Sequence, residues 1–146
     1  MLKKTCLAFS VYLLTASFAF AETHIGDFKS VSGTVSVTRQ GARVVPEAGS
    51  PLMQGDILVT GQDGKSGVSF MDGTRVAVGP NSELVVAEYR FVPLDKEYAF
   101  DMQLRKGEAA YASGRMGKLA PEAVKFSTPQ TSLGIRGTTF AVRVEQ

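Results

Sequence analysis

The stretch VSFMDGTRVAV, residues 68–78, decides the fold that we expect for this chain. Apolar residues occupy every second position on both sides of a central Asp-Gly pair, and such alternation is typical of half-buried strands. Asp72-Gly73 favours a tight turn, because aspartate bonds to nearby backbone groups and glycine accepts a positive φ. The stretch therefore predicts two strands joined by a turn.

The length of this turn decides which side chains share a face. A two-residue loop would put Val68 and Phe70 on the face opposite to Val76. A three-residue loop formed by residues 71–73 pairs Phe70 with Thr74. Val68 then lies opposite Val76, and all the apolar side chains share one face. This register predicts a bulged hairpin turn whose glycine is left-handed, whereas in a solenoid the same turn would form an arc between stacked sheets.

Similar alternation recurs along the rest of the chain, between frequent glycines and prolines. Roughly nine or ten short strands at this turn spacing predict an all-β fold in a single small domain, either a roll or sandwich or a β-solenoid. Leu94, Tyr98 and Met102 also fit helical spacing, but four consecutive alternations favour a strand there. The alternating segments are Val35–Val37, Ile57–Val59, Tyr98–Leu104, Val124–Phe126 and Phe140–Val144.

Two segments depart from simple alternation. Residues 84–91 carry apolar side chains in both phases, which indicates either a β-bulge or a strand buried on both faces. Residues 114–121 contain two basic residues and two glycines with little periodicity, so we expect an exposed loop.

The N-terminal residues 1–21 have the organisation of an export signal. Lys3 and Lys4 precede a largely apolar stretch, and Ala19 and Ala21 occupy the positions that a signal peptidase recognises. The apolar stretch is shorter than the roughly 20 residues that a membrane-spanning helix needs. We expect cleavage after Ala21 and a periplasmic product that does not span the membrane. An uncleaved inner-membrane anchor is the competing interpretation.

The composition of the remaining chain argues against several classes of function. The single cysteine, Cys6, lies in the export signal, so the exported chain is expected to have no disulfide and no thiol ligand. Two of the 16 basic residues also lie there, and the others balance the 14 acidic residues, which removes the electrostatic case for nucleic-acid binding. With one histidine, His24, a zinc site or a His-based triad is not expected. No segment supplies a calcium loop, and we expect no cofactor.

Several short motifs follow one another in an order that resembles a known family. They run from about Gly33 to Val144, and the Arg-Gly-Thr stretch followed by Phe140 is the most specific of them. On these motifs the chain resembles the FecR-like periplasmic domain family. The positions that carry the resemblance most directly are Gly55, Asp56, Asp72, Gly73, Thr128, Pro129, Arg136, Gly137, Thr138 and Phe140.

The resemblance implies an all-β periplasmic domain that binds or regulates. In the signalling members of the family, this region lies between a membrane anchor and a receptor-contacting part, and those proteins sense an outer-membrane receptor and control a sigma factor. Here we expect a stand-alone version, with residues 1–21 as a cleaved signal peptide, residues 22–30 as an N-terminal extension and residues 31–146 as the FecR-like domain.

We expect a non-enzymatic module that contacts an envelope protein. Open strand edges can accept a partner strand, and the segments 71–74 and 114–121 are the loops expected to join the contact. A glycan-binding module for peptidoglycan or surface polysaccharide is the alternative. A small hydrolase that uses carboxylates such as Asp101 and Glu108 is a third interpretation, although no spacing singles these residues out.

Two residue types could serve either function or packing. Tyr89, Tyr98 and Tyr111 could stack on sugars, but without tryptophan a core or half-exposed role is favoured. Arg136 could contact an anionic group on a partner. The favoured interpretation is an internal arginine that bonds backbone carbonyls or a carboxylate such as Asp72 or Asp56, because buried charges are paired.

Overall fold

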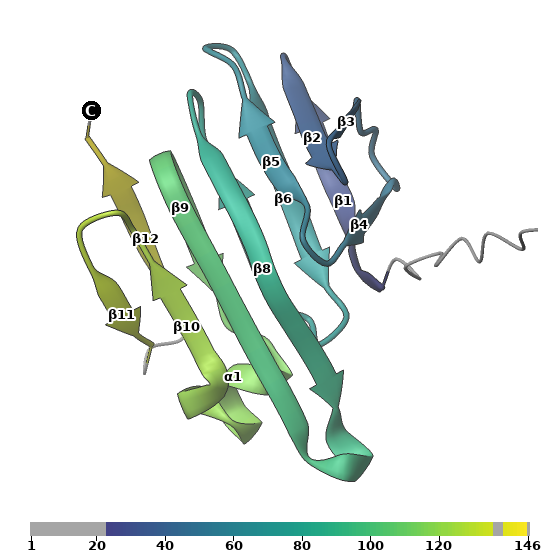
Figure 1. The fold of residues 1–146 in the computed structure, drawn as a ribbon, viewed down its shortest axis with the longest axis vertical. Helices are drawn as coiled ribbons and strands as arrows, with labels where there is room; N and C mark the ends of the chain where they lie inside the picture. Colours follow the sequence, from purple (N-terminus) through teal and green to yellow (C-terminus); the bar gives the residue numbers. More distant parts are fainter. Residues whose placement is uncertain (1–22, 136–138, 146) are drawn as a thin grey trace, which may run out of the picture.

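The structure is a computed structural model that describes residues 23–135 and 139–145. These residues form an all-β fold with one short helix, which confirms the predicted fold class (Figure 1). No helix in these two ranges has the length and apolar character needed to cross a membrane. The elements are β1 (His24–Ser32), β2 (Val35–Arg39), β3 (Ala42–Val44), β4 (Pro51–Met53), β5 (Ile57–Thr60), β6 (Lys65–Phe70), β7 (Arg75–Val78), β8 (Glu83–Val92), η1 (Pro93–Asp95), β9 (Glu97–Ala112), α1 (Arg115–Leu119), η2 (Pro121–Ala123), β10 (Val124–Ser127), β11 (Ser132–Gly134) and β12 (Thr139–Val144).

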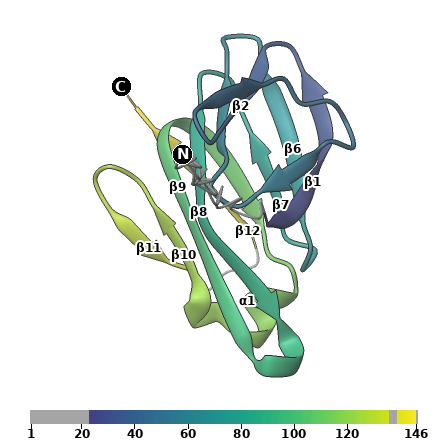
Figure 2. The same cartoon turned by 45° about the vertical axis from the view of Figure 1, so that its right-hand side comes forward.

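The strands form one open, curled sheet in the order β3-β2-β5-β8-β9-β7-β6-β1-β4. The 16-residue strand β9 joins the two halves of this sheet. Residues 97–106 of β9 pair with β8, whereas residues 107–112 pair with β12 and residues 109–112 also pair with β7. Figure 2 shows β9 curving over at one end of the molecule, so that the two halves enclose the core between them. The pairing is antiparallel except between β9 and β10, which makes the fold a roll and not a solenoid.

The hairpin that the sequence predicts is confirmed. The Phe70 N–H donates to the Thr74 carbonyl at 2.8 Å, and Val68 pairs with Val76. Gly73 has φ +85°, as the bulged three-residue turn requires. The apolar residues Val68, Phe70, Val76 and Val78 of the two strands are all buried in the core, so burial of this set fixes the register.

The core is built from the inward faces of both half-sheets. Three rings from different strands, Phe70, Tyr89 and Phe100, contact one another with centroids 4.8–5.3 Å apart. The other large, fully buried side chains include Phe28, Leu52, Leu58, Leu84, Met102, Leu104, Tyr111, Met116 and Phe126. This mixture of strands confirms one small domain core, since each half-sheet covers the apolar face of the other.

Two further strand predictions are confirmed. The β8–β9 register shifts between Val86 and Glu88, which is the bulge expected in residues 84–91. The bulge adds one residue to β8. The buried positions therefore follow one alternation before the bulge and the opposite alternation after it. Residues 98–104 form part of β9, so the helical alternative is wrong.

Two predictions are corrected. Residues 114–121 are not an exposed loop, because they contain α1, whose Met116 is buried together with Ala120. In β5 the core-facing residues are Leu58 and Thr60, and Ile57 and Val59 are only half-buried. The register of β2 on β5 decides this phase, which a four-residue segment does not show by itself.

The segment 22–30, expected as an extension ahead of the domain, contains most of β1. This strand pairs with both β4 and β6. Its Ile25 and Phe28 side chains are buried in the core. Residues 24–30 therefore form part of the sheet.

The bend of β9 depends on Gly107. Its φ is +86°, and an added Cβ would lie 2.5 Å from the Ser82 Cα, so both backbone strain and a collision oppose a side chain. Gly73 has nearly the same φ, +85°, with open space around it. We expect Gly73→Ala to lower the free energy of unfolding by about 1–2 kcal/mol. Gly107→Ala should lower it by about 2–5 kcal/mol, because overpacking is added to strain.

Urea denaturation of both variants measures this difference. Equal losses of stability in the two variants would show that close packing against Ser82 does not determine the bend.

Candidate functional site

The carboxylate of Asp72 lies at the centre of a buried hydrogen-bond network. It is 2% exposed and accepts hydrogen bonds from the Tyr89 hydroxyl at 2.9 Å and the Thr74 hydroxyl at 2.7 Å. The Met116 N–H donates to it at 3.0 Å, and the Asp72 N–H donates to the Tyr89 hydroxyl oxygen at 3.0 Å. This motif residue therefore joins the β6–β7 turn, β8 and α1.

The same network brings together the two segments expected to contact a partner. The Arg115 N–H donates to the Asp72 carbonyl at 2.9 Å, and the Gly114 N–H donates to the Thr74 hydroxyl at 3.1 Å. Met71 in the turn remains 62% exposed. The turn and α1 are therefore held together as one surface. The polar atoms of the motif residue Asp72 form hydrogen bonds within the protein.

A second motif carboxylate, Asp56, is buried against Arg39. The guanidinium donates to both carboxylate oxygens, at 2.9 and 2.7 Å, and Asp56 is 1% exposed. The Met53 N–H also donates to Asp56, at 2.9 Å. Arg136, which the sequence offers as a candidate partner of this carboxylate, lies outside the described residues. The pairing of β2 with β5, in which Thr38 lies opposite Ile57, places Arg39 beside Asp56. Knowledge of this register would have identified Arg39 as the partner of Asp56.

The remaining motif residues are placed in turns and in the last strand. Gly55 has φ +85° in the turn between β4 and β5. Thr128 and the exposed Pro129 lie in the turn after β10, where the Thr131 N–H donates to the Thr128 hydroxyl at 3.2 Å. Phe140 of β12 stacks on Tyr111 with a centroid distance of 4.9 Å. Gly137 and Thr138 lie outside the described residues.

The structure does not assemble the carboxylates and tyrosines considered for chemistry. Asp101 and Glu108 lie on opposite sides of the bend in β9, and Glu108 forms an ion pair with Arg143 at 2.8 Å. Tyr89 and Tyr111 are core residues. Within the described ranges, no three His, Cys, Asp or Glu side chains are grouped to hold a metal ion.

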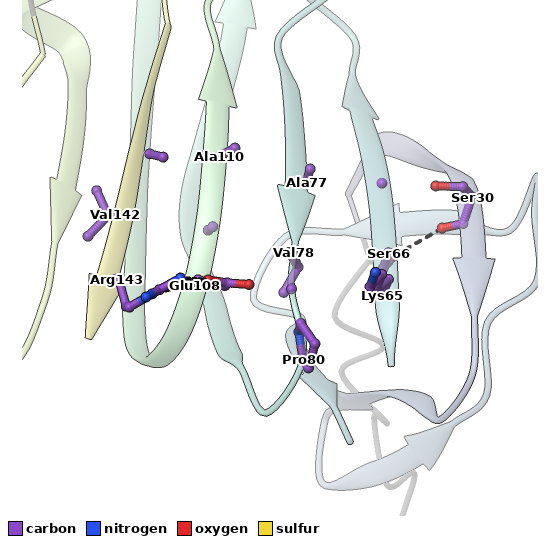
Figure 3. Close-up of a pocket in the computed structure, with 14 residues that line it drawn as sticks. Ser30, Lys65, Ser66, Ala77, Val78, Pro80, Glu108, Ala110, Val142 and Arg143 are labelled. Atoms are coloured by element: carbon purple, nitrogen blue, oxygen red, sulfur yellow. Dashed lines mark hydrogen bonds and ion pairs between the residues drawn. The ribbon is translucent and has the colours of Figure 1, made fainter. Parts of the chain in front are cut away.

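An open groove lies on the outer face of the half-sheet formed by β1, β6, β7, β9 and β12. Its floor is a row of small residues that are paired across these strands, one on each strand. A hollow of about 670 Å³ and a neighbouring one of about 300 Å³ share three of these residues. Figure 3 shows the residues that line the larger hollow. The row, which we call the small-residue row, is Ser30, Gly67, Ala77, Ala110 and Ala141.

Charged side chains flank the small-residue row on both sides. Lys65, Glu108 and Arg143 lie along one side, with Glu108 and Arg143 bonded to each other (Figure 3). Lys29 and Arg75 line the hollow on the other side. Sequence reasoning missed this groove, because alanine and glycine carry no chemical signal and only the strand register places them in one row.

The curled sheet and the buried motif residues define a small all-β domain, and the groove on its outer face is lined by other residues. A profile of the FecR protein family matches residues 56–146, and the chain belongs to that family. Membership indicates a regulatory or signalling module. No curated protein and no solved structure matches the chain.

The tyrosine hydroxyls of the core provide a matched pair of variants. Tyr89→Phe removes one donor and one acceptor from the Asp72 network, and we expect a loss of about 1–3 kcal/mol in the free energy of unfolding. The Tyr111 hydroxyl is equally buried but has no hydrogen-bond partner among the described residues, so Tyr111→Phe should leave stability within about 0.5 kcal/mol. Equal effects in urea denaturation would contradict the assigned role of Tyr89.

The same tyrosines predict a loss of stability at alkaline pH. Burial raises the pKa of Tyr89 far above 10.0, and the nearby Asp72 charge adds to the effect; burial also raises the pKa of Tyr111. Above about pH 10 the unfolded chain loses tyrosine protons that the folded chain retains, so stability falls as pH rises. Unfolding measured from pH 8 to 11 should show this decline, and Tyr89→Phe should make it shallower. An unchanged slope in that variant would contradict the assignment.

Proposed function

We propose that this chain is a non-enzymatic periplasmic module of the FecR family that regulates by binding an envelope protein. The open groove along the small-residue row carries the proposal, because apolar hollows on an otherwise polar surface mark sites of interaction. The export signal expected at residues 1–21 supports the compartment.

The internal use of the motif residues supports a binding role over a catalytic one. Asp56 and Asp72 are almost fully buried and are held by hydrogen bonds, so they support the turns and do not face a ligand. The candidate acid pair, Asp101 and Glu108, is divided by the bend in β9. The surfaces that the domain offers to a binding partner are the groove, the Met71 turn and the edges of those strands that pair on one side only.

The groove does not favour the glycan alternative. Protein surfaces that bind sugars commonly present aromatic rings, whose flat apolar faces and polar tips suit such ligands. The floor of this groove is serine, glycine and alanine, and two of the three candidate tyrosines are in the core. A protein partner is the better match to this surface.

Site-specific photocrosslinking in cells tests the proposal. A photoreactive amino acid at Ala110 in the groove, at Met71 in the turn or at the exposed Val44 on the edge strand β3 should capture one envelope protein. The same residue at Lys125, which is exposed on β10 in the other half-sheet, serves as the control. Capture of no envelope protein above the Lys125 background from any of the three positions would refute the proposed function.

A further inference from the structure

We infer that the groove receives an α-helix of the partner, with a stripe of small or apolar residues against the small-residue row and acidic residues on both flanks. This inference rests on the proposed function and specifies the chemistry of its partner. Three features carry it: the dimensions of the groove, the hydrogen bonding of its floor and the charges on its two sides.

The dimensions of the groove match a helix. The small-residue row crosses five strands, and neighbouring strands are about 4.8 Å apart, which gives a length of about 19 Å. The flanking rows are four residues apart along each strand, for example Glu108 and Ala112 on β9, which is about 13 Å. A helix with its side chains is about 10–12 Å wide, and about 13 residues of helix span 19 Å.

The backbone of the floor also favours a helix over an extended segment. Strands β6, β7 and β9 each pair with a neighbour on both sides, so their peptide groups already bond within the sheet. An extended segment on this face would find no backbone partners, whereas a helix satisfies its own peptide groups. Ala77, Ala110 and Ala141 are exposed, and their short side chains allow a helix to approach closely.

The charges select an acidic partner. Lys29, Lys65 and Arg75 are exposed on the two sides of the groove and form no ion pair with any described residue. The carboxylate at the groove, Glu108, is already bonded to Arg143. A second copy packed face to face would bring these cations together, which disfavours a homodimer through this face. Carboxylates on both flanks of a helix would pair with them.

The experiment identifies the crosslinked peptide and then measures its binding. Crosslinks from Ala77 and Ala110 are mapped by mass spectrometry, and the captured segment is synthesised as a peptide. We expect acidic residues at helical spacing on both sides of a small or apolar stripe, and an affinity that falls as salt rises. The double variant Lys65→Glu/Arg75→Glu should weaken binding at least tenfold, and Lys125→Glu should change it less than twofold. Circular dichroism confirms that each variant remains folded.

Each other outcome overturns the inference in a recognisable way. Capture from Met71 or Val44 but not from the groove would leave the proposed function standing and remove this site. A captured segment that is neutral, basic or extended, or a double variant that binds as well as the wild type, would remove the acidic helix. Capture from none of these positions would remove the proposed function as well.

Discussion

The bend in β9 is the constraint on which the rest of the structure depends. One strand can serve both half-sheets because Gly107 takes a positive φ directly against Ser82. The hydroxyl of Ser82, a fully buried residue, accepts the Glu108 N–H at 2.9 Å and donates to the Pro80 carbonyl at 3.0 Å. The backbone polar groups at the bend therefore have hydrogen-bond partners inside the protein, as buried backbone groups require.

The end of the roll opposite this bend is closed by the Asp72 network. Here a buried carboxylate takes neutral donors from three segments, including the first turn of α1. The helix has only five residues, which is too short to be stable alone, so its place is set by Asp72 and by the burial of Met116. With both ends of the roll fixed, the outer face of the β1-β6-β7-β9-β12 half-sheet is left uncovered, and the groove lies there.

The hairpin of residues 66–78 and the bulge in β8 could be predicted because their signals are local. Alternation on both sides of Asp72-Gly73 allows one register that buries all the apolar residues, and contiguous apolar residues in both phases require an irregular strand. The short helix could not be predicted from its own residues. Its stability comes from a turn more than 40 positions earlier in the chain, and a segment of one turn has no periodicity to detect.

The sequence by itself determined the fold class, the hairpin register and the family motifs, because strand periodicity and turn chemistry act between near neighbours. Only the tertiary structure decided which buried charge meets Asp56, how β9 divides between two half-sheets and where the molecule offers a surface. The small-residue row shows the physical reason. Its members, from Ser30 to Ala141, are individually featureless, and they become one groove only when five strands pair in a single register.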